Sequence, residues 1–167
     1  MKTFLLTTMT VLFLLLLTIE VQAQTTQTKL DQMELMKQPL GIWKGELAKD
    51  TVMIMNFTSF GLAIEDNYKI ATKDKILYSG KEIYGYNKKY DKIILAAISD
   101  NSPNIDLMAI WFSSKDTMNL VGYQYLSNPE KSTFKIQWIL IPADSAKRIV
   151  YQNNKVISVS TYFRVKQ

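Results

Sequence analysis

The sequence predicts an all-β fold in which about ten antiparallel strands follow one another and close into a barrel, after one short N-terminal helix. Three observations lead to this prediction. The hydrophobic period changes at Pro39 from about 3.6 residues to about 2, and it stays near 2 to the C-terminus. Clusters of Asn, Asp, Ser and Pro interrupt the alternation at short intervals. No later stretch has a helical pattern long enough for a parallel crossover, so neighbouring strands are expected to be antiparallel.

The first residues, 1–23, are expected to be a signal peptide that is removed after Ala23. Lys2 supplies the positive charge, residues 11–17 form the apolar run, and the segment ends on Val21-Gln22-Ala23. A retained transmembrane helix is the alternative, but the apolar run is shorter than the roughly 20 residues that span a bilayer. We therefore expect a single mature domain, 24–167, that is secreted or periplasmic and has no membrane anchor.

The one expected helix covers residues 29–37. Leu30, Met33 and Met36 recur there at steps of three residues, with Asp31 and Glu34 between them. This spacing places the apolar side chains on one face of a short amphipathic helix. Pro39 then ends it.

The expected strands lie between the turn clusters, such as 100–104 and 127–130. They cover residues 41–48, 51–58, 60–71, 75–86, 92–99, 105–113, 117–126, 133–141, 147–152 and 156–166.

Alternation along these strands favours a barrel over a sandwich. Strand 133–141 places Ile136 and Trp138 on one face and Lys135 and Gln137 on the other. The strands 75–86 and 105–113 differ, because they carry apolar residues on one face and aromatic residues on the other. Strands without a clean polar face suit a barrel whose interior is in part a lined cavity.

The composition excludes several kinds of chemistry. The 167 residues include no cysteine and no histidine, which removes disulfides, thiolate sites and the usual serine and cysteine triads. We therefore expect no metal and no cofactor, and we assign no catalytic residue. Carboxylates, Lys and Tyr are the side chains that remain for catalysis. The net charge of +5 is spread along the chain and does not form a basic patch, so no nucleic-acid partner is expected.

The segment LGIWKGEL at residues 40–47, taken with Arg164 in the last strand, resembles the calycin-like barrels. These include the lipocalins, the fatty-acid-binding proteins and the nitrobindin-like group. The chain looks most similar to the bacterial secreted family of unknown function numbered 1579, DUF1579, whose members commonly begin with Leu-x-Gly-x-Trp-x-Gly. The resemblance covers residues 29–166. Nitrobindin-like barrels bind haem through a histidine, which this chain lacks.

The resemblance implies a structural role for the opening segment. It implies that Trp43 closes one end of the barrel and that Arg164 packs across its ring, while Gly41 and Gly45 let the first strand bend and approach the ring. Such a contact combines apolar burial with a cation–π interaction of about 0.5 to 2 kcal/mol. These four residues are expected to be a barrel plug.

Aromatic side chains in the predicted strands are the candidates for binding a ligand inside the barrel. Two strand carboxylates, Glu46 and Glu82, are candidates for orienting a polar group of that ligand. Glu65, Asp66 and Asp106 also fall in strands, but no two of the carboxylates have a spacing that compels them to pair. The aromatic candidates are Tyr84, Tyr86, Trp111, Tyr123, Tyr125, Trp138 and Tyr162.

Three functions remain compatible with the sequence. The first is an exported barrel that binds a small hydrophobic or aromatic molecule without catalysis. The second is a cell-envelope interaction module whose barrel is filled and whose outer surface binds a partner, although the sequence specifies no such protein. The third is an enzyme that uses a buried carboxylate. A cavity of several hundred cubic ångströms is expected for the first, and a packed interior with an exposed apolar patch for the second.

Overall fold

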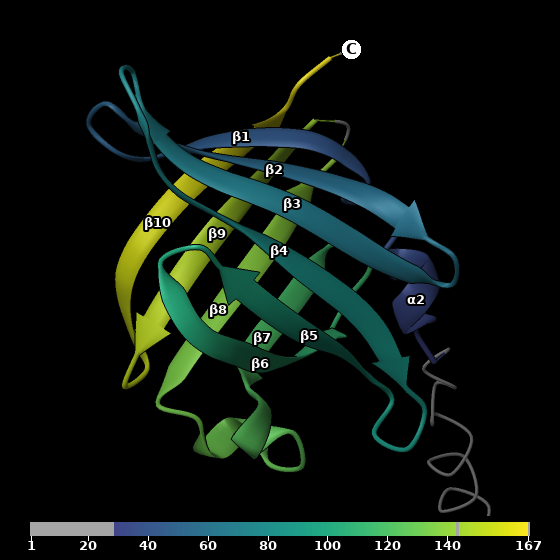
Figure 1. Cartoon of the computed structure of the whole chain (residues 1–167). Helices are drawn as coiled ribbons and strands as arrows, with labels where there is room; N and C mark the ends of the chain where they lie inside the picture. The colour runs from purple at the N-terminus through teal and green to yellow at the C-terminus, as the bar shows by residue number, and fades with distance from the viewer. Residues whose placement is uncertain (1–28, 143, 167) are drawn as a thin grey trace, which may run out of the picture.

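The computed structural model describes residues 29–142 and 144–166, which form one closed barrel of ten antiparallel strands (Figure 1). The strands follow the chain around the barrel, and β1 completes the ring by pairing with both β2 and β10. The predicted all-β barrel is therefore confirmed. The expected signal peptide lies outside the described residues. The strands are β1 Gly41–Ala48, β2 Thr51–Phe60, β3 Ala63–Thr72, β4 Ile76–Asn87, β5 Lys92–Ser99, β6 Ser102–Phe112, β7 Thr117–Gly122, β8 Phe134–Ile141, β9 Ser145–Gln152 and β10 Lys155–Arg164.

The tight turns depend on residues that tolerate a left-handed backbone. Asp50 joins β1 to β2 at φ 61°, and Asp91 precedes β5 at φ 51°. Asn153 and Asn154 join β9 to β10 at φ 49° and 62°. Asp and Asn adopt this region more readily than other residues with a side chain, which is why these turns are visible in the sequence.

The connection between β7 and β8 departs from the prediction. The strand expected over residues 117–126 ends at Gly122, and the chain continues as two 3₁₀ helices, Tyr123–Tyr125 and Pro129–Lys131. Leu126 packs there against Ala109 and Val121 in a cluster separate from the main core. The connection therefore covers part of the outer wall and does not continue it.

A short helix, α2 Gln32–Leu35, packs at one end of the barrel and is shorter than the predicted 29–37. Asp31 caps it, with its side chain accepting a 2.9 Å hydrogen bond from the Glu34 N–H. The buried Gln32 side chain bonds Phe112 twice, donating to its carbonyl at 3.3 Å and accepting from its N–H at 2.6 Å. No helix in the described part of the chain is long and apolar enough to cross a bilayer.

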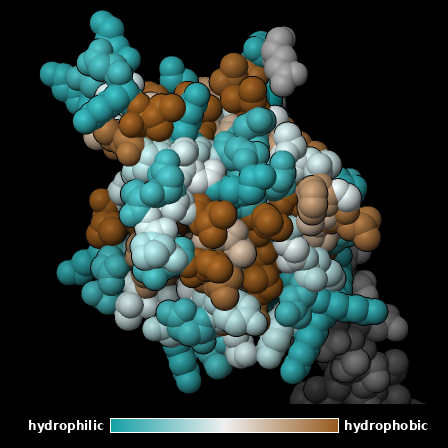
Figure 2. Space-filling view, viewed as in Figure 1, coloured by the Kyte–Doolittle hydropathy of each residue, from teal (hydrophilic) through white to brown (hydrophobic). Residues whose placement is uncertain are grey.

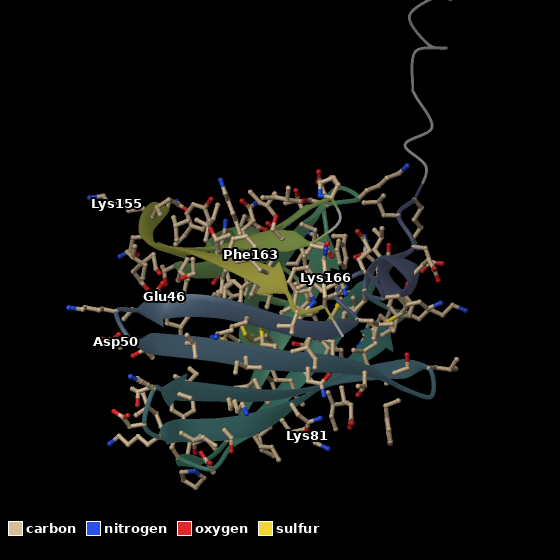
Figure 3. All side chains as sticks on the ribbon, turned by 90° about the horizontal axis from the view of Figure 1, so that it is seen from above. Glu46, Asp50, Lys81, Lys155, Phe163 and Lys166 are labelled. Atoms are coloured by element: carbon tan, nitrogen blue, oxygen red, sulfur yellow. The ribbon has the colours of Figure 1, made fainter. Side chains whose placement is uncertain are left out.

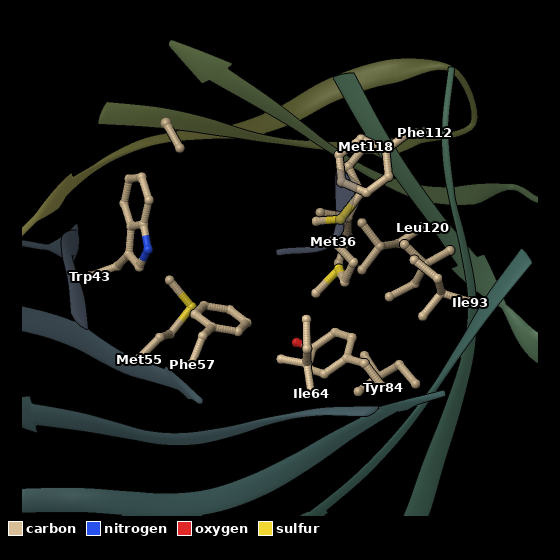
Figure 4. Packing of buried hydrophobic residues seen from close by; sticks show 14 of the residues in the cluster. Met36, Trp43, Met55, Phe57, Ile64, Tyr84, Ile93, Phe112, Met118 and Leu120 are labelled. Carbon is tan, nitrogen blue, oxygen red and sulfur yellow. The ribbon is translucent and has the colours of Figure 1, made fainter. Parts of the chain in front are cut away.

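The main core fills the barrel beneath this helix. Figure 4 shows Trp43, Met55 and Phe57 on one side of the interior and Met118 and Leu120 across from them. These side chains come from β1, β2 and β7, so the core connects strands from distant parts of the barrel wall. Methionine is flexible and fills irregular gaps, which suits an interior of changing width.

Gly45 on β1 lies against the Tyr162 ring of β10, and substitution there should be costly. It pairs with Tyr162, and an added Cβ would lie 2.4 Å from Tyr162 Cδ1. Tyr162 is fully buried and its ring cannot move aside freely. We expect Gly45→Ala to lower the free energy of unfolding by about 1–3 kcal/mol, measured by urea denaturation.

Gly85→Ala is the matched control, because a Cβ at Gly85 would have no atom within 4 Å. Its stability should change by less than about 0.5 kcal/mol. Equal losses in the two variants would show that close packing on Tyr162 is not the reason for glycine at position 45.

Candidate functional site

The helix-covered end of the barrel is built around Trp43. The Arg164 guanidinium carbon lies 4.4 Å from the centroid of its ring, and the two residues are paired across β1 and β10. Trp43 Nε1 donates a 2.7 Å hydrogen bond to the Pro39 carbonyl. Arg164 donates to the carbonyls of Leu40 and, at 2.8 Å, Gln38. Arg164 thus links the segment before β1 to β10, and its guanidinium group covers the buried indole.

Gly41 makes room for this arginine. Its φ of 113° is one that residues with a side chain rarely adopt, and an added Cβ would lie 3.0 Å from Arg164 Nη1. The two glycines are therefore required for different reasons. Gly41 provides a left-handed backbone conformation and space for Arg164, and Gly45 provides space for the Tyr162 ring.

Below Trp43 the barrel encloses a cavity of about 120 Å³. Most of its wall is apolar, with four methionines and four aromatic rings, and its charged groups are Glu82 and Arg148. The lining residues are Pro39, Trp43, Met53, Met55, Phe57, Glu82, Tyr84, Leu95, Met108, Met118, Leu120, Ile136, Trp138, Leu140, Ala146 and Arg148.

Four of the candidate ligand-binding residues lie at this cavity or directly against it. Tyr84, Trp138 and Glu82 line the cavity. Tyr162 packs against Trp138, with ring centroids 4.7 Å apart, and its hydroxyl lies 3.6 Å from the Met53 sulfur. The structure therefore brings these four together from β4, β8 and β10.

The aromatic candidates near the 3₁₀ connection do not reach the interior. Tyr123 is exposed, and Tyr125 packs in the outer cluster because the chain leaves the barrel wall after Gly122. Trp111 points outward from β6 into the same cluster, and Lys92 Nζ lies 5.6 Å from its ring centroid.

Glu46 and Tyr86 also lie away from the cavity. Glu46 is on the outer face of β1, where it lines a surface groove together with Phe163 of β10 (Figure 3). Tyr86 is exposed at the helix-covered rim, and its hydroxyl donates a 2.6 Å hydrogen bond to Asp91. Neither side chain can touch a molecule held inside the barrel.

Two carboxylates that the sequence did not indicate as a pair lie side by side on the interior wall. The β3–β4 register places Asp66 opposite Glu82, and the β2–β3 register places Phe57 on the other side of Asp66. Both side chains face inward, as do the buried Ile64 and Tyr84 two positions away. Strand register, which sequence spacing does not reveal, creates this pair.

The surroundings of the pair disfavour ionisation. Burial, with the Glu82 charge adding to it, raises the pKa of Asp66 from 3.8 to about 7, although the Asn56 N–H donates to Oδ1 at 2.6 Å and acts in the opposite direction. The other oxygen, Asp66 Oδ2, is buried and has no hydrogen-bond partner. Burial also raises the pKa of Glu82, opposed by the Tyr84 hydroxyl that donates to it and by the charge of Arg148.

Arg148 was not among the candidate residues, and it supplies the cavity with its positive charge. Among the ion pairs of the described residues, none joins it to Glu82. Two opposite charges thus line one cavity without direct contact. In the described part of the chain, no group of three or more acidic side chains is placed to hold a metal ion.

No protein-family model matches the chain, and no curated protein matches its sequence. The closed ten-stranded antiparallel barrel is compatible with a calycin-like fold.

Proposed function

We propose that this protein is an exported, non-catalytic barrel that binds a small apolar or aromatic molecule in its interior cavity. The observation that carries the proposal is the cavity itself, which combines an apolar wall with the inward-facing polar groups Glu82 and Arg148. Ligand sites in proteins usually have this composition, in which apolar surface provides affinity and a few polar groups fix orientation.

The cavity is smaller than the several hundred cubic ångströms expected from the sequence, and its volume limits the ligand to a compact molecule. Pockets for drug-sized ligands are about 300–1,000 Å³, and the 120 Å³ cavity is well below that range. An apolar cavity of about 150 Å³ holds a single benzene ring in another protein. We therefore set aside long-chain lipids and sterol-like molecules in favour of a ligand with one ring or a short aliphatic body.

Two residues suggest a route into the cavity. Trp43 and Leu140 line the cavity and also a pocket on the outer surface, next to Gln38 and Arg164. A ligand that passes between these two side chains would enter without opening a strand pair. On this route, the ligand would enter the cavity beside the segment that precedes β1.

Isothermal titration calorimetry with toluene, benzyl alcohol and lauric acid tests the proposal. Toluene and benzyl alcohol should bind, and lauric acid should not, because its chain exceeds the cavity. Ala146→Leu should weaken binding of both ring compounds by filling the cavity that Ala146 lines. Failure of both compounds to bind the wild-type protein would refute the proposal.

A second candidate function is favoured by apolar side chains on the outer wall. Ile83 and Leu107 are 45% and 44% exposed and lie on either side of Ala96 in the register of β4, β5 and β6. Figure 2 shows a hydrophobic patch over these strands. Such a patch is typical of protein–protein interaction sites, and a second copy of the chain is the partner that we propose. Sedimentation velocity should then show a wild-type dimer that Leu107→Lys dissociates, and a monomeric wild type would remove this candidate.

Export and relation to the bacterial secreted family numbered 1579 are parts of the same proposal. They are supported by the features of residues 1–23 and by the segment at 40–47. Protein expressed with its full N-terminus in a bacterial host should be recovered outside the cytoplasm with Gln24 as its first residue. Cytoplasmic protein that retains Met1 would refute the export part.

A further inference from the structure

Glu82 and Arg148 are the charged side chains that line the cavity, and a second carboxylate lies next to Glu82. This is Asp66, which is paired with Glu82 across β3 and β4 on the inner face of the barrel, so these three groups comprise two acids and one base. We propose that the ligand of this cavity is a small amine, whose single positive charge binds at Glu82 beside Asp66. This inference rests on the proposed function and names the class of molecule that the same cavity would take.

Charge balance is the first argument. With both carboxylates ionised and Arg148 positive, the interior has one unmatched negative charge, which is costly in a medium of low polarity. Without a ligand, burial favours a proton on the pair, as the raised pKa of Asp66 indicates. An ammonium group in the cavity would balance the charge directly, so its binding would favour the ionised pair.

Unused acceptors are the second argument. Asp66 Oδ2 is buried and accepts no hydrogen bond, an arrangement that is rare in folded proteins. Glu82 accepts one from the Tyr84 hydroxyl through Oε2. An ammonium group has three N–H donors and no acceptor, whereas an acidic or carbonyl head group would bring only further acceptors to this wall.

The aromatic lining is the third argument. Trp43, Phe57, Tyr84 and Trp138 all line the cavity, and the faces of such rings attract cations. Phe57 and Tyr84 are also neighbours, with ring centroids 5.9 Å apart. A ring-bearing amine would therefore contact aromatic surface with its body and carboxylate oxygen with its charged end.

Other charged and titratable groups around the pair belong to several strands. Each influences the pKa of Asp66, Glu82 or a tyrosine near them. They are Tyr68 on β3, Tyr78 and Tyr84 on β4, Asp106 on β6 and Arg148 on β9.

Three probes that share one ring and differ in the charge of the head group test the inference: benzylamine, benzyl alcohol and benzoate. At about pH 8, calorimetry should give benzylamine an affinity about 10- to 100-fold higher than that of benzyl alcohol. Benzoate should bind most weakly. Lowering the pH to about 5 should weaken benzylamine binding, because protonation of Asp66 removes a negative charge.

Variants separate the charge effect from a loss of folding. Glu82→Gln and Asp66→Asn should each weaken benzylamine binding about tenfold or more, and should weaken benzyl alcohol binding by a much smaller factor. An unchanged circular dichroism spectrum shows that each variant is folded. Arg148→Gln should bind benzylamine as tightly as the wild type or more tightly, since it removes the competing cation.

The possible failures are distinguishable. If benzyl alcohol binds but benzylamine binds no more tightly, the amine inference is wrong and the proposed function stands. If benzoate binds most tightly, Arg148 holds the head group and the ligand class is acidic. If none of the three probes binds, the inference and the proposed function both fail.

Discussion

Replacing Trp43 with alanine is expected to lower the free energy of unfolding by about 3–5 kcal/mol, the largest effect of any single substitution considered. The indole is 4% exposed, lies under Arg164, and donates a hydrogen bond to the Pro39 carbonyl. Its removal would extend the existing cavity toward the surface and leave that arginine without its aromatic contact. Urea denaturation monitored by circular dichroism measures the loss.

Phe163→Ala is the matched control for this substitution. Phe163 is also aromatic and lies next to Arg164, but it is 61% exposed on the outer face of β10. Its loss should change stability by less than about 0.5 kcal/mol. A Trp43 variant as stable as the Phe163 variant would refute the account of the closed end.

Stability is expected to fall as the pH rises from about 4 to 7, because of Asp66. The pKa of this group is about 7 in the folded protein and near its usual 3.8 in the unfolded chain. Between these values the unfolded chain releases the proton and the folded protein keeps it, so the equilibrium shifts toward unfolding. Below about pH 4 both states are protonated, and above about pH 7 the loss is complete. The full shift corresponds to roughly 4 kcal/mol.

The comparison with Asp66→Asn isolates this effect from that of the other carboxylates. Urea denaturation at a series of pH values should show the variant gaining stability relative to the wild type from about pH 4 to 7, with a constant difference above that. Glu65→Gln is the control, since Glu65 pairs with Lys81 on the outer face of the same strand. A difference between Asp66→Asn and the wild type that does not grow with pH would contradict the burial of this carboxyl.

The architecture could be predicted from sequence because it depends on local signals. Alternation along each strand, the period change at Pro39, and turn residues such as Asp50 and Asn154 are all readable from neighbouring positions. The connection after Gly122 was mistaken for strand, because Tyr123 and Tyr125 continue the alternation. Their tertiary contacts with the outer wall, which no local pattern reports, decide the conformation.

The interior site was only partly predictable, for a geometric reason. The parity of a strand assigns residues to one face, and Glu82 and Tyr84, both sequence candidates, share the inner face of β4. The register between strands decides which residues become neighbours, and it placed Asp66 next to Glu82. Arg148 passed unnoticed, since one basic residue in an alternating strand suggests exposure to solvent.

The most direct test of an interior binding site is an NMR titration of protein labelled at the methionine methyl groups. Met53, Met55, Met108 and Met118 line the cavity, whereas Met33 belongs to α2 and lines a separate outer pocket. Addition of benzyl alcohol should shift the signals of the four cavity methyls and leave that of Met33 in place. A titration that shifts Met33 alone, or none of the five, would contradict the proposal that the barrel interior is the ligand site.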